Sequence, residues 1–131
     1  MRIPLQHGTL LFVLPLLLLS CDPAQDATTS LDAKAFAVRI GEGNVQLVDV
    51  RTPAEYAQGH LANAVNLDWT GGQLEARATT LEKTRPVLLY CASGRRSADA
   101  REYLAEQGFN EVVDLEGGIN AWTGSGGAVT R

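Results

Sequence analysis

The sequence has few cysteines: Cys21 and Cys91 are the only two among its 131 residues. Two cysteines cannot build the disulfide framework of a small secreted domain, and they cannot supply a cysteine-rich metal site. The chain also lacks internal repeats and a glycine-rich phosphate-binding fingerprint. The sequence therefore predicts no metal site and no fold that depends on disulfide bonds.

Positive charge is scarce as well. The chain has 11 basic and 15 acidic residues, which gives a net charge of −4 at pH 7. Without residues 1–20, which contain one arginine, the balance becomes 10 against 15, or −5. Such a chain lacks the basic surface of a nucleic-acid-binding protein, and we expect no nucleic-acid partner. Any attraction for a small anion must come from a local group of residues.

Long hydrophobic runs are confined to the N-terminal end. Residues 9–19 form an apolar segment after the positively charged start, Met1-Arg2. The segment is roughly half the ~20 residues that a membrane-spanning helix needs. This pattern is typical of a secretory signal peptide, which we predict for residues 1–20. The alternative is a short membrane anchor that is not cleaved.

The end of this segment and the next two residues resemble a bacterial lipobox, with the sequence Leu18-Leu19-Ser20-Cys21. The resemblance implies that Cys21 is lipidated and begins the mature chain, with residues 21–30 as a polar tether. It implies an exported, membrane-anchored lipoprotein that faces the periplasm; the alternative is a soluble periplasmic or secreted protein. If Cys21 carries a lipid, Cys91 has no cysteine partner within the chain.

Strand-like and helix-like segments alternate from residue 31 onward. Helical patterns cover residues 31–40, 52–59, 73–81, 96–107 and 117–122, and strand patterns cover residues 45–50, 64–67, 86–90 and 111–115. The alternation predicts an α/β fold with a parallel sheet and helices on both of its faces. We expect one domain over residues 31–123, followed by a flexible glycine- and serine-rich tail at residues 124–131.

Cys91 follows the carboxyl end of the apolar strand predicted at residues 86–90, where ligands bind in parallel α/β sheets. It begins a tight loop that opens a helix, and the loop amides together with the helix N-terminus favour an anion. A free thiol has a pKa near ~8.5, which such settings lower by roughly one to several units. Cys91 is therefore a candidate nucleophile, although free cysteines are often simply buried. The residues expected to hold an anionic substrate are Ala92, Ser93, Gly94, Arg95, Arg96 and Ser97.

The pattern Cys-x-x-Gly-x-Arg-Ser of residues 91–97 resembles the active-site loop of rhodanese-type sulfurtransferases. In cysteine-dependent phosphatases five residues separate the cysteine from the arginine, whereas four separate Cys91 from Arg96. Residues 47–56, 59–67 and 115–122 are also similar to motifs of rhodanese-like domains. The resemblance covers roughly residues 30–123 and implies that Arg96 is the better anion contact. Arg95 is either a further contact or only a solvated charge.

The resemblance implies a single-domain sulfurtransferase. In this reading Cys91 takes the outer sulfur of thiosulfate or of a persulfide donor and passes it, as a persulfide, to cyanide or a thiol. No metal or organic cofactor is implied, and we expect a monomer. The alternatives are a non-catalytic rhodanese-like binding module and a small cysteine phosphatase or arsenate reductase.

Residues of the other motifs are expected to support the site without taking part in the chemistry. We predict that Asp49 and Arg51 pair with each other or with Glu55, and that His60 serves packing and loop hydrogen bonding. Two glycines are expected to allow a tight turn beside the active loop. The supporting residues are Asp49, Arg51, Glu55, His60, Gly117 and Gly118.

Overall fold

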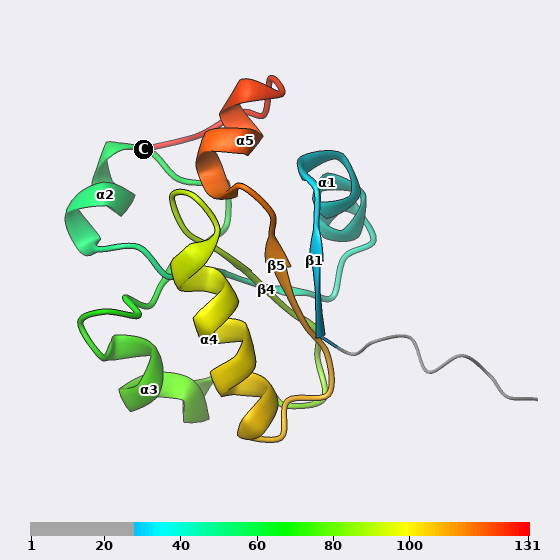
Figure 1. Ribbon diagram of the computed structural model, residues 1–131, viewed down its shortest axis with the longest axis vertical. Coiled ribbons are helices and arrows are strands. Elements are labelled where there is room, and N and C mark those ends of the chain that lie inside the picture. Colours follow the sequence, from blue (N-terminus) through cyan, green and yellow to red (C-terminus); the bar gives the residue numbers. More distant parts are fainter. Residues whose placement is uncertain (1–27) are drawn as a thin grey trace, which may run out of the picture.

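The computed structural model describes residues 28–131 as a single parallel sheet with helices on both faces (Figure 1). The strand order is β1-β5-β4-β2-β3, and every neighbouring pair is parallel. This confirms the predicted fold class. The elements are β1 (Thr28–Leu31), α1 (Ala33–Gly41), β2 (Gln46–Asp49), α2 (Pro53–Gln58), β3 (Val65–Asn66), α3 (Gln73–Arg77) with a 3₁₀ turn (Ala78–Thr80), β4 (Val87–Tyr90), α4 (Arg95–Glu106), β5 (Val112–Leu115) and α5 (Gly118–Gly124).

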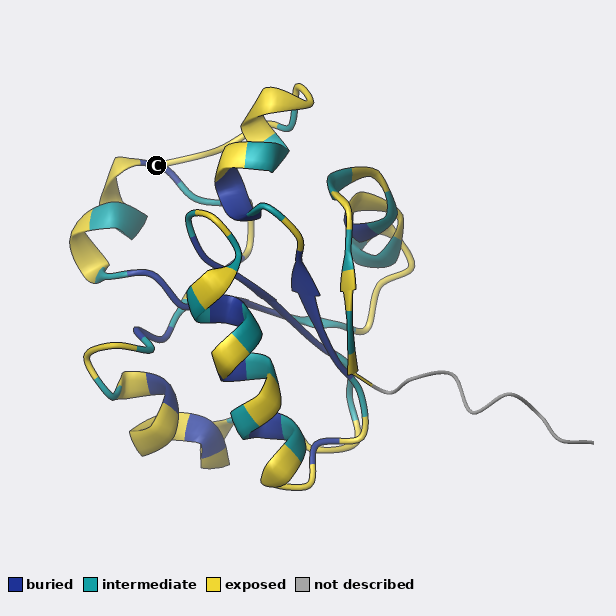
Figure 2. Cartoon of the chain, viewed as in Figure 1, coloured by how far each residue is buried: buried dark blue, intermediate teal, exposed yellow. Residues whose placement is uncertain are grey.

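The central strand β4 explains how the two layers of helices pack. All four of its residues are buried, as Figure 2 shows for β4 and β5. Since successive side chains of a strand point to opposite faces, β4 contributes to both cores. Val87 and Leu89 belong to the core that includes Leu104 of α4, whereas Leu88 packs in the core that includes Phe36 of α1. The apolar run 86–90 is thus the middle of the sheet.

The sheet begins earlier than the sequence predicts. Residues 28–30 were expected to belong to the polar tether, but they form most of β1, and Thr28 lies opposite Val112 of β5. The backbone ladder with β5 stabilises this strand despite its polar sequence. The helix expected from residue 31 begins at Ala33, because Asp32 caps it by accepting a hydrogen bond from the Ala35 N–H at 2.8 Å.

The C-terminal residues 124–131, predicted to be a flexible tail, are mostly exposed but make hydrogen bonds to the domain. Trp122 donates a hydrogen bond from Nε1 to the carbonyl oxygen of Ala128 at 2.9 Å. His60 and Thr130 exchange two backbone hydrogen bonds of 2.9 and 2.8 Å in an antiparallel bridge. The indole and the bridge therefore fix a segment whose glycines and serine suggested disorder.

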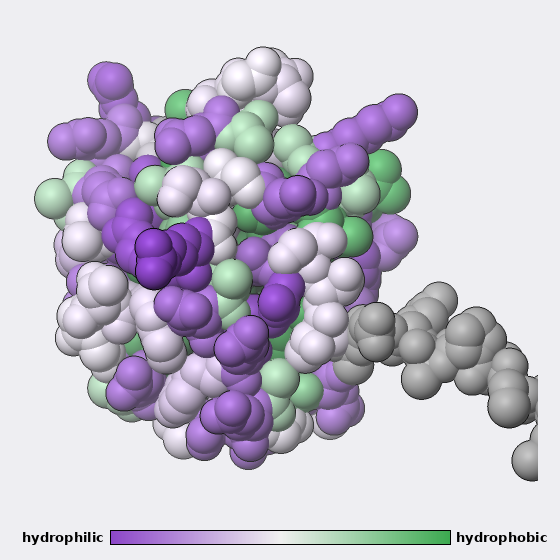
Figure 3. All heavy atoms as spheres, viewed as in Figure 1, coloured by the Kyte–Doolittle hydropathy of each residue, from purple (hydrophilic) through white to green (hydrophobic). Residues whose placement is uncertain are grey.

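The molecular surface is mixed in character. The face seen in Figure 3 carries mainly polar and weakly polar residues, with apolar residues scattered among them. Within residues 28–131, no helix combines the length and the apolar character that crossing a membrane requires. The predicted signal peptide at 1–20 and the lipidation of Cys21 lie outside the described residues.

Candidate active site

Cys91 lies directly after β4, at the carboxyl edge of the sheet, and is only 1% exposed. The Gly94 N–H donates a hydrogen bond to Sγ at 3.1 Å, and the Ser97 hydroxyl lies 3.5 Å from Sγ. Gly94 adopts a positive φ of 102° immediately before α4, so the loop curls back over the sulfur. The sulfur is therefore surrounded by hydrogen-bond donors, the Gly94 N–H and the Ser97 hydroxyl, at the start of α4.

These hydrogen-bond donors change the acidity of the thiol. Burial raises the pKa of Cys91, because it disfavours the charged form, but hydrogen bonds from the Ser97 hydroxyl and from the N–H groups of Ser97, Gly94 and Ser93 lower it. The hydrogen bonds outweigh the burial, and the pKa of Cys91 lies below its ordinary value. The site favours a thiolate that is shielded from solvent.

The first turn of α5 holds the active loop from the other side. Ile119 N–H donates to the Cys91 carbonyl oxygen at 2.9 Å, and Asn120 N–H donates to the Ala92 carbonyl oxygen at 3.1 Å. Gly118 brings the two backbones together: it has φ +60°, and a Cβ there would stand 2.5 Å from the carbonyl oxygens of Cys91 and Ala92. The glycine is thus required for the close approach.

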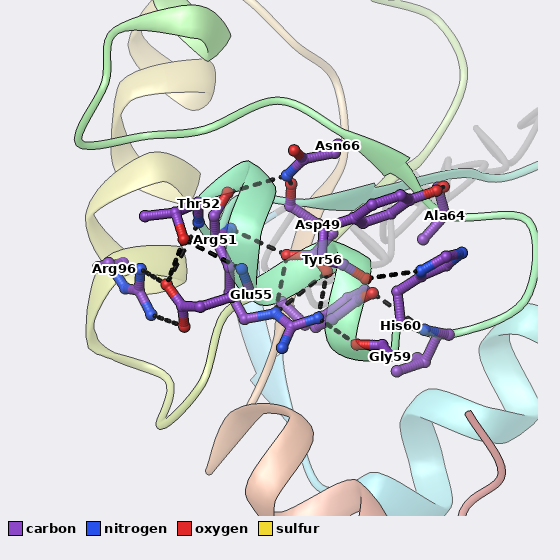
Figure 4. Close-up of polar contacts among 12 residues, drawn as sticks. Asp49, Arg51, Thr52, Glu55, Tyr56, Gly59, His60, Ala64, Asn66 and Arg96 are labelled. Carbon is purple, nitrogen blue, oxygen red and sulfur yellow. Dashed lines mark hydrogen bonds and ion pairs between the residues drawn. The ribbon is translucent and has the colours of Figure 1, made fainter. Parts of the chain in front are cut away.

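Arg96 is engaged in an ion pair that the sequence did not predict. Its Nη1 and Nη2 donate to the two carboxylate oxygens of Glu55 at 2.8 and 2.9 Å (Figure 4). Arg95, in contrast, is exposed. The Glu55 carboxylate raises the pKa of Arg96, burial opposes this, and the Cys91 thiolate adds a smaller increase. Arg96 therefore links α4 to α2 and lies within electrostatic range of the active cysteine.

Glu55 is positioned by the start of α2. Thr52 caps the helix by accepting a hydrogen bond from the Glu55 N–H at 3.2 Å, and the Glu55 side chain accepts from the Thr52 N–H at 3.3 Å. The hydrogen bonds from Arg96 lower the pKa of Glu55 to about 2, although burial opposes the shift and Thr52 assists it. The capping box thus presents a carboxylate that stays ionised.

Asp49 and Arg51 pair with each other, which is one of the two predicted alternatives. The shortest contact, from Arg51 Nη2 to Asp49 Oδ2, is 2.7 Å, and both side chains are buried. The same Nη2 donates to the Gly59 carbonyl oxygen at 2.7 Å, and the guanidinium lies over the Tyr90 ring at 5.7 Å. The pair ties the end of β2 to the turn after α2 (Figure 4).

His60 makes packing and loop contacts. Its ring stacks on Tyr56 with centroids 3.7 Å apart and planes 7° apart. Its Nδ1 is 3.0 Å from the Tyr56 carbonyl oxygen, which can only accept, so Nδ1 carries the proton. Together with the bridge to Thr130, these contacts fix the loop that leads to β3.

A cavity of about 320 Å³ opens beside the active loop, between α2 and α5. Its lining mixes polar and apolar side chains and includes residues from the loop and from the C-terminal segment: Arg51, Glu55, Gln58, Gly59, Ala92, Ile119, Asn120, Thr123 and Val129. A small molecule could reach the loop from here. Among the described residues, no cluster of three or more His, Cys, Asp or Glu side chains could hold a metal.

Sequence analysis did not identify one buried carboxylate near the cysteine, that of Asp114. Asp114 of β5 is 1% exposed, and its Oδ2 lies 3.5 Å from the Ser97 hydroxyl. The available signal was a carboxylate within the otherwise apolar strand 112–115, since charged residues are rarely buried without a partner.

Comparisons with known proteins identify the family of the chain. The rhodanese-like domain family matches residues 32–125. A curated protein of Allochromatium vinosum named "Sulfurtransferase" is 40% identical over 97 residues, which are 73% of this chain and 89% of that protein. The family match includes the active loop.

Solved structures show the same likeness. The crystal structure of a rhodanese-related protein from Thermoplasma volcanium is 34% identical, with a TM-score of 0.70, over 78% of this chain and 97% of that chain. The solution structure of a rhodanese-like domain from Anabaena is 28% identical, with a TM-score of 0.69, over 77% of each chain. The matched region of the family extends from α1 to α5.

Proposed function

The chain belongs to the rhodanese-like domain family, and we propose that it transfers a sulfane sulfur from a small anionic donor to a thiophilic acceptor through a persulfide on Cys91. The observation that carries the proposal is the hydrogen bonding of Sγ by Gly94 and Ser97, which favours the nucleophilic thiolate. Thiosulfate is the proposed test donor, and cyanide or a low-molecular-weight thiol is the proposed acceptor.

The proposed reaction has two displacements at sulfur. The Cys91 thiolate attacks the outer sulfur of thiosulfate, a new S–S bond forms, and the S–S bond of the donor breaks so that sulfite leaves with the electron pair. The acceptor anion then attacks the outer sulfur of the persulfide, and the Cys91 thiolate leaves with its electron pair. This is covalent, ping-pong catalysis, and neither step consumes a proton or needs an external oxidant.

The active loop can bind an anionic donor although the chain as a whole carries a net negative charge. The donor and the thiolate repel each other, so positive groups must compensate where they meet. The loop amides and the start of α4 supply one part of this compensation. Arg96 supplies another part, reduced by its pairing with Glu55. Non-catalytic binding would make no use of a thiol whose pKa is lowered.

Cys91→Ser tests the proposal. We expect the variant to lose all thiosulfate-to-cyanide sulfur transfer, because a serine hydroxyl cannot hold a sulfane sulfur. Intact-mass measurement of the wild-type protein after thiosulfate treatment should show one added sulfur atom, and the variant should show none. The matched control is Cys21→Ser, which removes the other cysteine and should retain full activity. Turnover in a folded Cys91→Ser protein would contradict the proposal.

We also propose that the protein is exported and anchored to a membrane by a lipid on Cys21, facing the periplasm. The support is the apolar segment at 9–19, which ends in the lipobox-like sequence Leu18-Leu19-Ser20-Cys21. Mass spectrometry of the native protein should find an N-terminal, acylated Cys21, and Cys21→Ala should release the protein from the membrane fraction. An unmodified Cys21, or an N-terminus before it, would contradict this proposal.

A further inference from the structure

We propose that Asp114 is a positioning residue for Cys91: it competes with the Cys91 sulfur for the Ser97 hydroxyl, and it holds that hydroxyl beside the sulfur while Cys91 carries the persulfide. The role rests on the proposed function, in which the Cys91 thiolate is the reacting group. It assigns a purpose to a buried carboxylate that the sulfur chemistry itself does not use.

The two oxygens of the Asp114 carboxylate have different surroundings. Oδ1 accepts hydrogen bonds from Ser30 Oγ of β1 and from Arg101 Nη1 of α4, both at 2.6 Å. Arg101 Nη1 also donates to Ser30 Oγ at 2.7 Å, which closes a triangle around Oδ1. A buried carboxylate is costly unless it is paired, and this triangle stabilises its charge.

Oδ2 faces the active site instead. Its hydrogen-bond neighbour among the described residues is the Ser97 hydroxyl at 3.5 Å, and Ser97 is completely buried. The same hydroxyl lies 3.5 Å from Cys91 Sγ and 3.2 Å from the Gly94 carbonyl oxygen. A hydroxyl carries one proton, so it can donate to only one of these three acceptors at a time.

Which acceptor receives the Ser97 proton depends on the charge on the sulfur. When Cys91 is a thiolate, the negative charge lies on Sγ, which then attracts the Ser97 proton. In the persulfide, much of the charge moves to the outer sulfur, and the hydroxyl can turn toward Asp114 Oδ2 or the Gly94 carbonyl oxygen. Only the O–H bond rotates, and no proton is transferred. Asp114 thus stabilises Ser97 during the part of the cycle when Sγ needs it least.

Two further ion pairs lie near Cys91, and Arg95 of the same loop is exposed. Arg96 of α4 pairs with Glu55 of α2, and Arg51 pairs with Asp49 at the end of β2. The turn before α5 and its first residues meet the loop through backbone groups. Asp114, balanced by Arg101, is therefore the charged group that β5 and α4 place behind Ser97.

The test measures how Cys91 titrates when the charge behind Ser97 is changed. In the full chain with Cys21→Ser, Cys91 is the only thiol, and its alkylation rate by iodoacetamide against pH reports its pKa directly. Asp114→Asn removes the negative charge that competes for the Ser97 proton, so this proton is free to stabilise the thiolate. The pH midpoint of Cys91 alkylation should therefore fall by about one unit. Arg101→Gln leaves the carboxylate uncompensated, so the midpoint should rise by a similar amount.

A double variant separates action through Ser97 from a direct effect of charge. With Ser97→Ala present, Asp114→Asn should shift the midpoint by less than half as much as in the Ser97 background. If Asp114→Asn does not fold, Ser30→Ala removes one hydrogen bond to Oδ1 from an exposed position and should raise the midpoint slightly. Thermal unfolding of each variant provides the control for folding.

Three outcomes would overturn the proposal: an unchanged midpoint in Asp114→Asn, shifts of the same sign in Asp114→Asn and Arg101→Gln, or an undiminished shift in the Ser97→Ala background. Alkylation does not depend on sulfur transfer. A Cys91→Ser protein that still turns over thiosulfate would therefore refute the proposed function while the alkylation result stood on its own.

Discussion

At the scale of single residues, Arg96 is the positive charge near two anionic groups, the Glu55 carboxylate and the Cys91 thiolate. Its guanidinium binds both oxygens of Glu55, and it is also close enough to Cys91 for the thiolate to raise its pKa. An approaching anionic donor would compete with Glu55 for the same charge. The arginine can therefore act as a donor contact, as a brace for the loop, or as both.

Arg96→Ala should lower the thiosulfate efficiency, kcat/KM, about ten- to a hundred-fold, because a lost charged hydrogen bond is worth roughly 1.5–3 kcal/mol. Arg95→Ala is the matched control, since Arg95 is the exposed neighbour, and it should change the efficiency less than about two-fold by the small value of exposed charges. Steady-state kinetics with both variants measures the difference. Equal losses for the two variants would rule out a specific role for Arg96.

Glu55→Gln separates the two roles of Arg96. If the arginine contacts the donor, releasing it from Glu55 should leave KM for thiosulfate unchanged or lower. If the ion pair only braces the loop, the variant should lose as much efficiency as Arg96→Ala. We expect the first result. The sequence could not predict this pair, because Glu55 and Arg96 are 41 positions apart and only the fold brings α2 to α4.

At the scale of elements, the first turn of α5 is a clamp on the active loop. Gly118→Ala should destabilise the protein by about 2–4 kcal/mol, since it combines a positive φ with a clash against the Cys91 and Ala92 carbonyl groups. Denaturant unfolding measures the loss, and thiosulfate turnover should fall as the loop is displaced.

The same helix provides the control for Gly118. Gly124→Ala lies at the other end of α5, where a Cβ meets no atom within 4 Å and φ is not positive. It should change the free energy of unfolding by less than about 0.5 kcal/mol, as for most surface substitutions. If both alanine variants unfold at the same denaturant concentration, the proposed clamp does not exist.

Most helices and strands were predictable from the sequence, but β1 and the contacts of the C-terminal segment were not. The apolar run of β4 and the capping box of α2 each follow from local patterns, and the structure has both. β1 was missed because its sequence, Thr-Thr-Ser-Leu, is polar and its pairing with β5 is made by backbone groups. The contacts of residues 124–131 were missed for a similar reason: they depend on a distant bridge to His60.

At the scale of the whole molecule, acid stability should depend on the Glu55–Arg96 pair. The pKa of Glu55 is lowered in the folded chain, from 4.5 to about 2, so the unfolded chain takes up this proton first. The stabilisation is complete above about pH 4.5 and is lost as the pH falls toward 2. The difference in unfolding free energy between wild type and Glu55→Gln should therefore shrink through this window.

The control for the acid transition is Glu75→Gln, which changes an exposed carboxylate on α3. Its stability difference from wild type should stay small and nearly constant between pH 5 and pH 2, in line with the low value of exposed charges. Urea unfolding at several pH values measures both variants. A wild type and a Glu55→Gln protein that lose stability in parallel on acidification would contradict the assignment.

Because all strands run in the same direction, the sheet has an amino edge and a carboxyl edge. Thr28, Val112 and Val87 lie level with one another at the amino edge, and the chain enters the sheet there. Cys91 lies at the opposite edge, one four-residue strand away, or about 13 Å by the rise per residue. A tether attached through the residues before β1 therefore holds the protein at the edge of the sheet opposite Cys91, and it leaves the edge that carries the active loop unobstructed for a sulfur carrier.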